Sequence, residues 1–421
     1  MGKNSLIRCR ILNKVLRRSL SILKWTGIVV LGLIAILLTI RFIGKLYYNR
    51  TPDGGINEAM YIDVNGQEQW ISIYGEDKDN PVMLFLHGGP GFSTSFVDWP
   101  AFRKLAKDYT IVNWDQRNSG LTWIHDPKEE EITPELMRKD IDRVVEYTLE
   151  YTHKDILTLL GTSWGTMYGG DYAVRHPEKV DCFICLSLSV DEYADEYIGR
   201  AILDYVEGRI DFRTAVDTYG YELFLFNDPF GATDDISLQK KYYEGNKLSW
   251  LELAKNNEDD LALLESYDPT VYVDHFHIEE DKELEKRSLE AEKTEKELGE
   301  KYGYDQDALY DDIDFSPIAA MYFNPYYSLM DWIHFDSEGI DDETADKICE
   351  DFLLSEITEF EMPVYVLQGN RDCQCGAIQE YFDMISAPDK ELRVIEGNHS
   401  STMAKSDLMA EFIHGIVEKQ K

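Results

Sequence analysis

The sequence predicts an α/β protein with a mostly parallel central sheet, an inserted helical cap and one N-terminal transmembrane helix. Three observations carry this prediction: short apolar runs bounded by turn residues, helical patterns between them, and an uncharged apolar segment near the N-terminus. Continuous apolar runs are typical of strands buried on both faces of a sheet. With 421 residues, the chain is long enough for a large core and an inserted second unit.

The strands and helices follow from this apolar pattern. Two alternating runs, 61–64 and 69–74, are joined by Asn65-Gly66, which predicts a β-hairpin. Further strands are expected at 82–86, 109–113, 156–160, 182–188, 364–367 and 392–395. Helices are expected at 134–152 and 164–176. Alternation of strands and helices favours parallel pairing.

The strand–helix rhythm stops between residues 190 and 360, where acidic, aromatic-rich helical patterns replace it. We interpret this region as a helical cap inserted into the sheet domain. Residues 279–301, rich in Glu and Lys, predict a polar helix with a solvated face.

The N-terminal segment predicts a membrane anchor. Residues 25–40 carry no charge, and the run continues past Arg41 to Gly44, so a helix over 25–44 spans a bilayer if Lys24 and Arg41 snorkel. A cleaved signal peptide is the alternative, but small residues for a cleavage site are missing after the run. Seven basic residues precede the run and three closely follow it. This bias predicts a single-pass protein of the cell membrane with a cytoplasmic N-terminus and an extracellular body.

These expectations divide the chain into six segments. They are a basic cytoplasmic tail (1–24), a transmembrane helix (25–44), a linker (45–57), a first core part (58–190), the cap (191–359) and a second core part (360–421).

The charge distribution restricts the partners. The first 50 residues contain ten basic and no acidic residues, yet the chain carries a net charge of −37. A strongly acidic body repels phosphate backbones, so the sequence excludes nucleic acid as a partner and favours cationic substrates. The lipid bilayer is the expected partner of residues 25–44, and the oligomeric state stays open.

A Gly-x-Ser-x-Gly motif lies where the strand at 156–160 gives way to a helix. Gly161 and Gly165 flank Ser163, and small residues are needed there because a sharp strand-to-helix turn brings neighbouring chains close. Such a turn projects the serine Oγ from the sheet. Ser163 is therefore the candidate nucleophile.

A serine nucleophile needs a base and a group that orients the base. Asp372 follows the strand at 364–367, and His399 follows the strand at 392–395. Both lie at carboxyl ends of strands, where open α/β sheets place their sites. The chain order Ser, Asp, His is that of the α/β-hydrolase triad. Weaker alternatives are Asp383, Asp389, His414, His275 and His277.

A second glycine-rich loop follows the strand at 82–86. It reads His87-Gly88-Gly89-Pro90-Gly91. A bare glycine backbone lets N–H groups point at a developing oxyanion, and the residue after the nucleophile, Trp164, supplies a second donor.

Taken together, these motifs resemble the proline iminopeptidase (prolyl aminopeptidase) family of α/β-hydrolases. The resemblance rests on HGGPG at 87–91, DQRNSG at 115–120, GTSWGT at 161–166, GNRD at 369–372 and EGNHS at 396–400, and it covers about 58–190 and 360–421. It implies the α/β-hydrolase fold and Ser163 as nucleophile, with Asp372 and His399 as partners and Gly89 and Trp164 as oxyanion donors. The remaining motif residues are expected to be structural: His87, Gly88, Pro90, Gly91, Asp115, Gln116, Arg117, Gly161 and Gly165.

The chain departs from this family at three points. Asn118 and Phe92 stand where the family usually has glycine; Asn tolerates a positive φ, and Phe92 is expected to reshape the pocket mouth. Family aminopeptidases also bind the substrate amino group with cap carboxylates, and no particular Asp or Glu of this cap aligns with them.

The leading functional hypothesis is a membrane-anchored serine hydrolase that forms an acyl-enzyme and releases an N-terminal residue from short peptides. The alternative is a carboxylesterase or lipase-like enzyme with an acyl pocket lined by Phe224, Phe226, Tyr322 and Tyr326. A third hypothesis is a silent surface binding protein. The substrate is a small peptide or an ester, and neither cofactor nor metal is expected, although Cys373 and Cys375 form a weak candidate for a redox or metal site.

Overall fold

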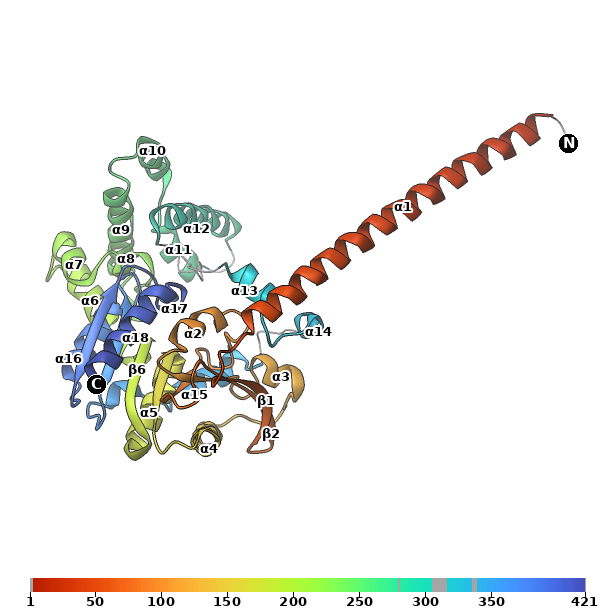
Figure 1. Cartoon of the computed structure of the whole chain (residues 1–421). Coiled ribbons are helices and arrows are strands. Elements are labelled where there is room, and N and C mark those ends of the chain that lie inside the picture. Colours follow the sequence, from red (N-terminus) through yellow and green to blue (C-terminus); the bar gives the residue numbers. More distant parts are fainter. Residues whose placement is uncertain (1–2, 279–280, 305–315, 335–338, 421) are drawn as a thin grey trace.

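The computed structural model describes residues 3–278, 281–304, 316–334 and 339–420 (Figure 1). Within these residues an eight-stranded sheet of order β1-β2-β4-β3-β5-β6-β7-β8 forms the centre. Its strands are β1 (Ile56–Val64), β2 (Gln67–Gly75), β3 (Val82–Leu86), β4 (Thr110–Trp114), β5 (Leu157–Ser163), β6 (Val180–Leu188), β7 (Val364–Gly369) and β8 (Lys390–Ile395). β2 pairs antiparallel with β1 and β4, and the pairs from β4 to β8 are parallel. The predicted mostly parallel α/β sheet is confirmed.

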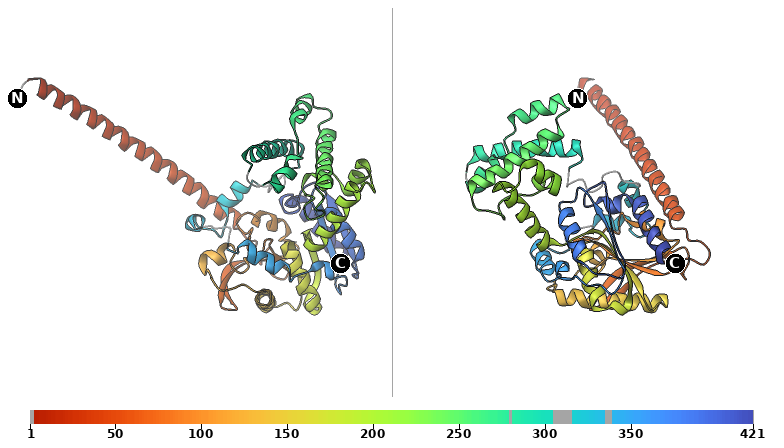
Figure 2. Two further views of the ribbon diagram at one scale, coloured as in Figure 1. Left: turned by 180° about the vertical axis from the view of Figure 1, so that it is seen from behind. Right: turned by 90° about the vertical axis from the view of Figure 1, so that its left-hand side faces the viewer.

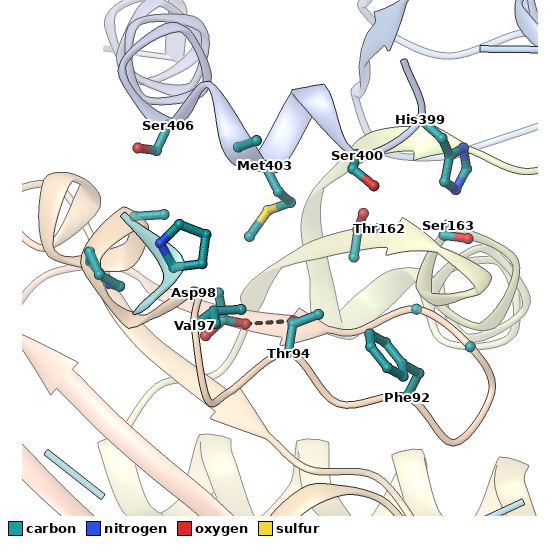
Figure 3. Close-up of a pocket in the computed structure, with 16 residues that line it drawn as sticks. Phe92, Thr94, Val97, Asp98, Thr162, Ser163, His399, Ser400, Met403 and Ser406 are labelled. Carbon is teal, nitrogen blue, oxygen red and sulfur yellow. Dashed lines mark hydrogen bonds between the residues drawn. The ribbon is translucent and has the colours of Figure 1, made fainter. Parts of the chain in front are cut away.

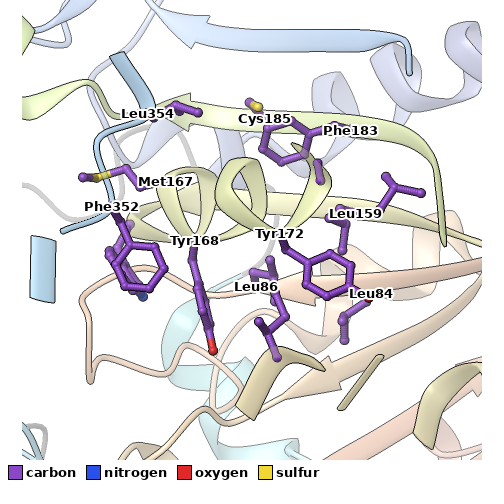
Figure 4. Packing of buried hydrophobic residues seen from close by; sticks show 14 of the residues in the cluster. Leu84, Leu86, Leu159, Met167, Tyr168, Tyr172, Phe183, Cys185, Phe352 and Leu354 are labelled. Atoms are coloured by element: carbon purple, nitrogen blue, oxygen red, sulfur yellow. The ribbon is translucent and has the colours of Figure 1, made fainter. Parts of the chain in front are cut away.

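Both faces of the sheet are covered by helices. Leu84 and Leu86 of β3 face a core formed with α4 (Pro134–Thr152), α5 (Trp164–Arg175) and α16 (Cys375–Met384). Met83 and Phe85 face the opposite core, formed with α2 (Trp99–Leu105) and α18 (Ser406–Gln420). Figure 4 shows Tyr168 of α5 packed beside the strands. Burial on both sides explains why these strands appear as continuous apolar runs in the sequence.

Local capping sets the bounds of α4. The Thr133 side chain accepts a hydrogen bond from the Leu136 N–H, Pro134 occupies the first turn, and His153 ends the helix in the left-handed conformation. The other core helices are short: α3 (Gly120–His125), η1 (Pro177–Lys179) and α17 (Ser401–Ala404).

The segment between β6 and β7 is helical, as the sequence predicted. It contains α6 (Asp191–Val206), α7 (Phe212–Tyr219), α8 (Glu222–Leu225), α9 (Ile236–Leu253), α10 (Glu258–Ser266), α11 (Val271–His277), α12 (Lys282–Tyr302), α13 (Pro317–Phe323), α14 (Leu329–Ile333), α15 (Asp342–Cys349) and η2 (Leu354–Glu356). α9 to α12 rise above the sheet domain (Figures 1 and 2), whereas α6 packs beside α16, with Ala194 buried in the core of the sheet domain.

The polar helix expected at 279–301 corresponds to α12, but one side of α12 is buried. Residues 279–280 lie outside the described residues, and α12 begins at Lys282. One side of α12 is not solvated, because Ala291 and Leu298 are buried against the cap core and the Tyr272 hydroxyl donates to Glu295 Oε2 at 3.1 Å. Sparse apolar positions were sufficient to give this helix a packed face.

The N-terminal helix α1 (Lys3–Tyr48) projects from the body as one long rod (Figures 1 and 2). Among the described residues, its segment Leu20–Tyr48 is the one helix long and apolar enough to cross a membrane, a test that a signal sequence also passes. The helix extends beyond both ends of the predicted span of 25–44. Arg41 differs from the expectation of snorkelling: it is buried, and its guanidinium donates to carbonyl groups in and near α13.

Candidate active site

Ser163 occupies a sharp turn between β5 and α5. Its backbone has φ +52° and ψ −127°, a combination that L-residues rarely adopt and that the surrounding structure must hold in place. Two glycines make the turn possible. A Cβ on Gly161 would lie 2.4 Å from the Gly165 carbonyl oxygen, and a Cβ on Gly165 would lie 2.0 Å from that of Leu86. The motif therefore has the strand–turn–helix context that its chemistry requires.

The glycine-rich loop after β3 passes directly beside Ser163. A Cβ on Gly88 would lie 3.3 Å from Ser163 Cβ and 3.7 Å from its Oγ. Gly89 has φ +111° and lines the same cavity as Ser163. Gly91, with φ +88°, leaves room for Ile340, whose Cβ would be 2.8 Å from an added Cβ. The close approach of bare backbone to Ser163 suits an oxyanion-binding loop.

Asp372 and His399 are brought together by the ends of β7 and β8. His399 Nδ1 lies 2.6 Å from Asp372 Oδ2, and Asp372 also accepts from Gln368 Nε2 at 2.7 Å and from the Gln374 N–H at 3.1 Å. Since a carboxylate can only accept, Nδ1 carries the proton and Nε2 is the basic nitrogen of the neutral ring. The Asp372 side chain is 1% exposed and the His399 side chain 36%. His399 therefore links a buried carboxylate to the open cavity.

Close backbone contacts hold the two loops in register. A Cβ on Gly369 would lie 2.4 Å from the Gly397 carbonyl oxygen, so this crossing requires glycine. Asn370 Oδ1 accepts from the Gly397 N–H at 3.0 Å. From β6, the Ser187 hydroxyl donates to the His399 carbonyl and lies 2.7 Å from the Thr402 hydroxyl. The position of His399 thus depends on three neighbouring strand ends.

A second layer of polar residues lies behind Ser163. Trp164 is buried, and its ring N–H donates to Gln116 Oε1 at 3.1 Å. Gln116 in turn donates from Nε2 to the His87 carbonyl at 3.1 Å, and its backbone N–H donates to His87 Nε2 at 3.0 Å. The His87 ring accepts this bond only when Nε2 is unprotonated, and burial lowers its pKa to about 4. His87 is thus a neutral structural residue.

The other polar motif residues, Asp115 and Arg117, are also buried away from the cavity. Asp115 accepts from the Ser93 hydroxyl at 2.5 Å and the Leu121 N–H at 2.7 Å, while burial raises its pKa to about 7. Arg117 forms a fully buried bidentate ion pair with Asp140 of α4, at 2.6 and 3.0 Å. Asn118 has φ +52°, so its backbone adopts a conformation that favours glycine. These residues fix the loop behind the site.

Ser163 and His399 open into one cavity of about 240 Å³ (Figure 3). Most of its wall is apolar. The lining residues besides Ser163 and His399 are Gly88, Gly89, Phe92, Thr94, Val97, Asp98, Pro100, Ala101, Thr162, Pro317, Ser400, Met403, Ala404 and Ser406. Phe92 lines the wall, as expected from its position in the glycine-rich loop. Pro317, the first residue of α13, comes from the cap.

Asp98 is a pocket residue that sequence reasoning missed. It is buried, accepts from the Thr94 hydroxyl at 2.7 Å and from Asn113 Nδ2 at 3.3 Å, and its burial raises its pKa well above the usual range. Asp98 stands at the N-cap position of α2, but its side chain makes no capping hydrogen bond. In the sequence, an Asp two residues before Pro100 is typical of the start of a helix. This pattern gives no indication that Asp98 lines the cavity.

The aromatic residues proposed for an acyl pocket lie elsewhere. Phe224 is in the cap core, Phe226 packs on Tyr304 at 6.2 Å, and Tyr326 packs on Trp70 at 5.1 Å. Tyr322 donates its hydroxyl to the Leu37 carbonyl of α1. Their aromatic character reflected packing rather than substrate contact.

The alternative polar candidates also have other surroundings. Asp389 accepts from the Tyr365 hydroxyl at 2.6 Å, His414 pairs with Asp108, and His277 Nε2 lies 2.9 Å from Gln239 Oε1. Burial raises the pKa of the Cys375 thiol to about 11, which keeps it protonated. In the part of the chain that the structure describes, no group of three or more His, Cys, Asp or Glu side chains is arranged to hold a metal ion.

Comparisons with known proteins agree with this fold. Residues 81–209 match the family model described as the alpha/beta hydrolase fold. The probable aminopeptidase YbaC of Bacillus subtilis is 30% identical over 135 residues, which cover 32% of this chain and 42% of that protein. The proline iminopeptidase of Lactobacillus helveticus is 35% identical over 129 residues, covering 29% and 40%. The matched regions thus span about two fifths of these relatives.

Among solved structures, a proline iminopeptidase-related protein of Thermus thermophilus has a TM-score of 0.42 and 15% identity, covering 86% of this chain and 99% of that one. A membrane phospholipase A has a TM-score of 0.44 and 15% identity, covering 99% of both chains. The family match and the sheet described above show that the chain has the α/β-hydrolase fold, and over the matched regions its sequence is similar to that of proline iminopeptidases.

Proposed function

We propose that this chain is a membrane-anchored serine hydrolase that acts through an acyl-enzyme on Ser163, and that it is an aminopeptidase releasing an N-terminal residue from short peptides. The observation that carries the proposal is the shared cavity of Ser163 and His399, with Asp372 hydrogen-bonded to His399 Nδ1 at 2.6 Å. The relatives named aminopeptidase and proline iminopeptidase support the peptidase interpretation.

In the proposed chemistry His399 acts as a base and then as an acid in each half-reaction. His399 Nε2 takes the Ser163 proton as Oγ attacks the substrate carbonyl, and Asp372 stabilises the imidazolium that forms. The N–H groups of Gly89 and Trp164 bind the oxyanion; Trp164 begins α5, where N–H groups have no partner within the helix. His399 then protonates the leaving group as its bond to the acyl carbon breaks. In the second half-reaction His399 takes a proton from the attacking water and returns it to Ser163 Oγ as the bond between Oγ and the acyl carbon breaks.

Asp98 is the proposed anchor for the substrate amino group. Of the described residues that line the cavity, it is the one carboxylic acid. A protonated amine beside it favours the ionised carboxylate, so binding of the cation and ionisation of Asp98 are coupled. The body's excess of acidic residues attracts the same cation over a longer range.

A second candidate, hydrolysis of acyl esters, is favoured by the apolar wall of the cavity. Phe92, Val97, Ala101 and Met403 give an environment suited to an uncharged acyl group. Burial raises the pKa of Asp98, which favours the neutral acid in the unliganded protein and suits an uncharged substrate.

One set of rates separates the two candidates. The full chain, purified in detergent, is assayed on a prolyl arylamide with a free amino group, on its N-acetyl derivative and on a short-chain p-nitrophenyl ester. The variants are Ser163→Ala and Asp98→Asn. Their matched controls are Ser237→Ala and Asp259→Asn, at polar positions on α9 and α10 outside the cavity.

The aminopeptidase proposal expects cleavage of the free amide, loss of cleavage on acetylation, and loss in both cavity variants but in neither control. Ester cleavage that Asp98→Asn leaves unchanged, without amide cleavage, contradicts the aminopeptidase and supports the esterase. Activity that survives Ser163→Ala contradicts the serine mechanism for both.

The proposed orientation places the N-terminus in the cytoplasm and the catalytic domain outside the cell. It is supported by the ten basic and no acidic residues of the first 50. Protease added to intact cells that express the chain should digest the catalytic domain, whereas digestion only after the cells are opened contradicts this orientation.

A further inference from the structure

The end of α1 nearest the body is held by charged hydrogen bonds to the cap. The Arg41 guanidinium donates to the carbonyl oxygens of Tyr322 at 2.5 Å and Tyr327 at 2.7 Å, and Lys45 Nζ donates to the Tyr327 oxygen at 3.1 Å. Tyr322 belongs to the last turn of α13, where carbonyl groups lack partners within the helix and attract cations. These bonds fix α1 to the segment formed by α13 and α14.

Close packing accompanies these bonds. A Cβ on Gly44 would lie 2.1 Å from the Phe323 ring, so glycine lets α1 and α13 touch. The Tyr48 ring lies 5.6 Å from Phe323 and 5.3 Å from Trp99 of α2. The Trp99 ring N–H donates to the Ala320 carbonyl at 3.0 Å. α13 is therefore clamped between the membrane helix and the sheet domain.

The contact reaches into the apolar part of α1. The Tyr322 hydroxyl donates to the Leu37 carbonyl, whereas the predicted membrane span ends at Gly44. A helix rises about 1.5 Å per residue, so this contact lies about 10 Å inside the end of the span. If α1 spans a bilayer, α13 lies between the headgroup boundary at Gly44 and a depth of about 10 Å in the hydrocarbon.

The outer side of α13 and α14 is apolar and exposed. Ile318 is 79% exposed, Leu329 48%, Met330 58% and Ile333 71%; these four residues are here called the apolar rim. Asp331, in the same stretch, is engaged with Ser328 in a capping box. Figures 1 and 2 show α13 at the base of α1 from opposite sides. An apolar surface continuous with a lipid-facing helix is typical of a membrane contact.

We propose that the apolar rim lies in the bilayer interface and that α13 and α14 hold the catalytic cavity beside the membrane surface. The occupant of this surface is lipid, because α13 packs against α1 at Leu37 and Gly44, inside the predicted membrane span. The proposal rests on the membrane anchoring proposed above. Pro317, the residue before Ile318, lines the cavity with Ser163, so one wall of the pocket is placed by the membrane contact.

Depth-dependent fluorescence quenching tests the proposal without using catalysis. Single cysteines replace Ile318 or Ile333, carry an NBD label, and are compared in the full chain in phosphatidylcholine vesicles with and without doxyl lipids. Leu31→Cys, in the middle of α1, is the positive control. Leu289→Cys, at an exposed leucine on α12, is the negative control. The unsubstituted chain, treated in parallel, gives the background from its own cysteines.

The proposal expects doxyl lipids to remove most of the fluorescence at Ile318, Ile333 and Leu31 and to leave Leu289 unchanged. Quenching at Leu31 alone overturns the apolar rim as a membrane contact while the anchor stands. Absence of quenching at Leu31 overturns the anchor and the rim together. If the NBD fluorescence at Ile318 and Ile333 is unchanged by doxyl lipids but changes with protein concentration, a second copy of the chain covers this surface. That result also overturns the proposal.

Discussion

The two sides of the cavity that contains Ser163 and His399 are built in different ways. On the sheet side, Ser163 and His399 stand at strand ends, and each is fixed by glycine contacts and hydrogen bonds from adjacent strands. On the cap side, Pro317 is held through α13, which depends on Trp99 and on residues of α1 far away in the sequence. The difference shows that Ser163, His399 and most of the cavity wall belong to the sheet domain, whereas the cap contributes Pro317 through contacts between distant parts of the chain.

The sharpest test of the sheet side is Asp372→Asn. An amide has one accepting oxygen, so it cannot accept from both His399 Nδ1 and the Gln374 N–H, as the two carboxylate oxygens do, and the imidazole loses its required tautomer. The expected fall in kcat is on the order of 10⁴-fold for every substrate, as for the same change in a triad carboxylate elsewhere. Steady-state rates normalised to folded protein measure it.

Asp389→Asn is the matched control, because Asp389 lies in the same part of the chain, directly before β8, but accepts from Tyr365 instead. We expect its kcat to stay within about threefold of the unchanged chain, since no group at the site loses a partner. An equal fall in kcat in both variants would contradict the proposed role of Asp372 as the partner of His399.

The next largest effect is expected on stability, from the buried ion pair between Arg117 and Asp140. Asp140→Asn leaves the buried Arg117 guanidinium with the half-exposed Glu130 carboxylate, 3.3 Å away, as its charged partner, and this is expected to lower the free energy of unfolding by about 3 kcal/mol. The melting temperature, followed by near-UV circular dichroism, should fall, while the rate per folded molecule changes little. Asp142→Asn on the same helix, with a 37% exposed side chain paired to Arg175, should cost at most about 1 kcal/mol. A similar loss in both variants contradicts the role given to the buried pair.

These differences explain what the sequence could and could not predict. The strands were predictable because parallel strands covered on both faces leave continuous apolar runs, and Ser163 was marked by glycines that the local turn requires. Asp98 was not predictable, because its carboxyl joins the cavity only after α2 packs beside the β3 loop. Phe224 was assigned to a possible substrate wall, yet it serves the cap core, since aromatic side chains fill cores as readily as pockets.

A smaller, pH-dependent effect tests the layer beneath the site. His87 has a folded pKa of about 4, below its ordinary value of 6.5, so its contribution to stability is lost as pH falls from 6.5 to 4. Asp115 has a folded pKa of about 7, above its ordinary value of 3.8, so its contribution is lost as pH rises through that interval. The two contributions oppose each other over the same pH range.

Asp115→Asn removes one of the two opposing contributions. The melting temperature of this variant should therefore fall more steeply on acidification from pH 6.5 to pH 4 than that of the unchanged chain, by a few degrees. Thermal scans at several pH values measure the difference. Parallel pH profiles for the two proteins would contradict the opposed protonation of His87 and Asp115.

The smallest effect is expected at Phe92, in the part of the cavity wall that belongs to the sheet domain. Phe92→Ala removes an apolar side chain that lines the pocket. The expected result is a fall of about tenfold in kcat/KM for a long-chain p-nitrophenyl ester, or about 1.4 kcal/mol, with a smaller change for the acetate. Phe276→Ala, at an exposed phenylalanine on α11 away from the cavity, serves as control. Equal losses on both esters would place Phe92 with the residues that support the chemistry, whereas a loss that grows with acyl length shows that substrate choice begins at this side chain.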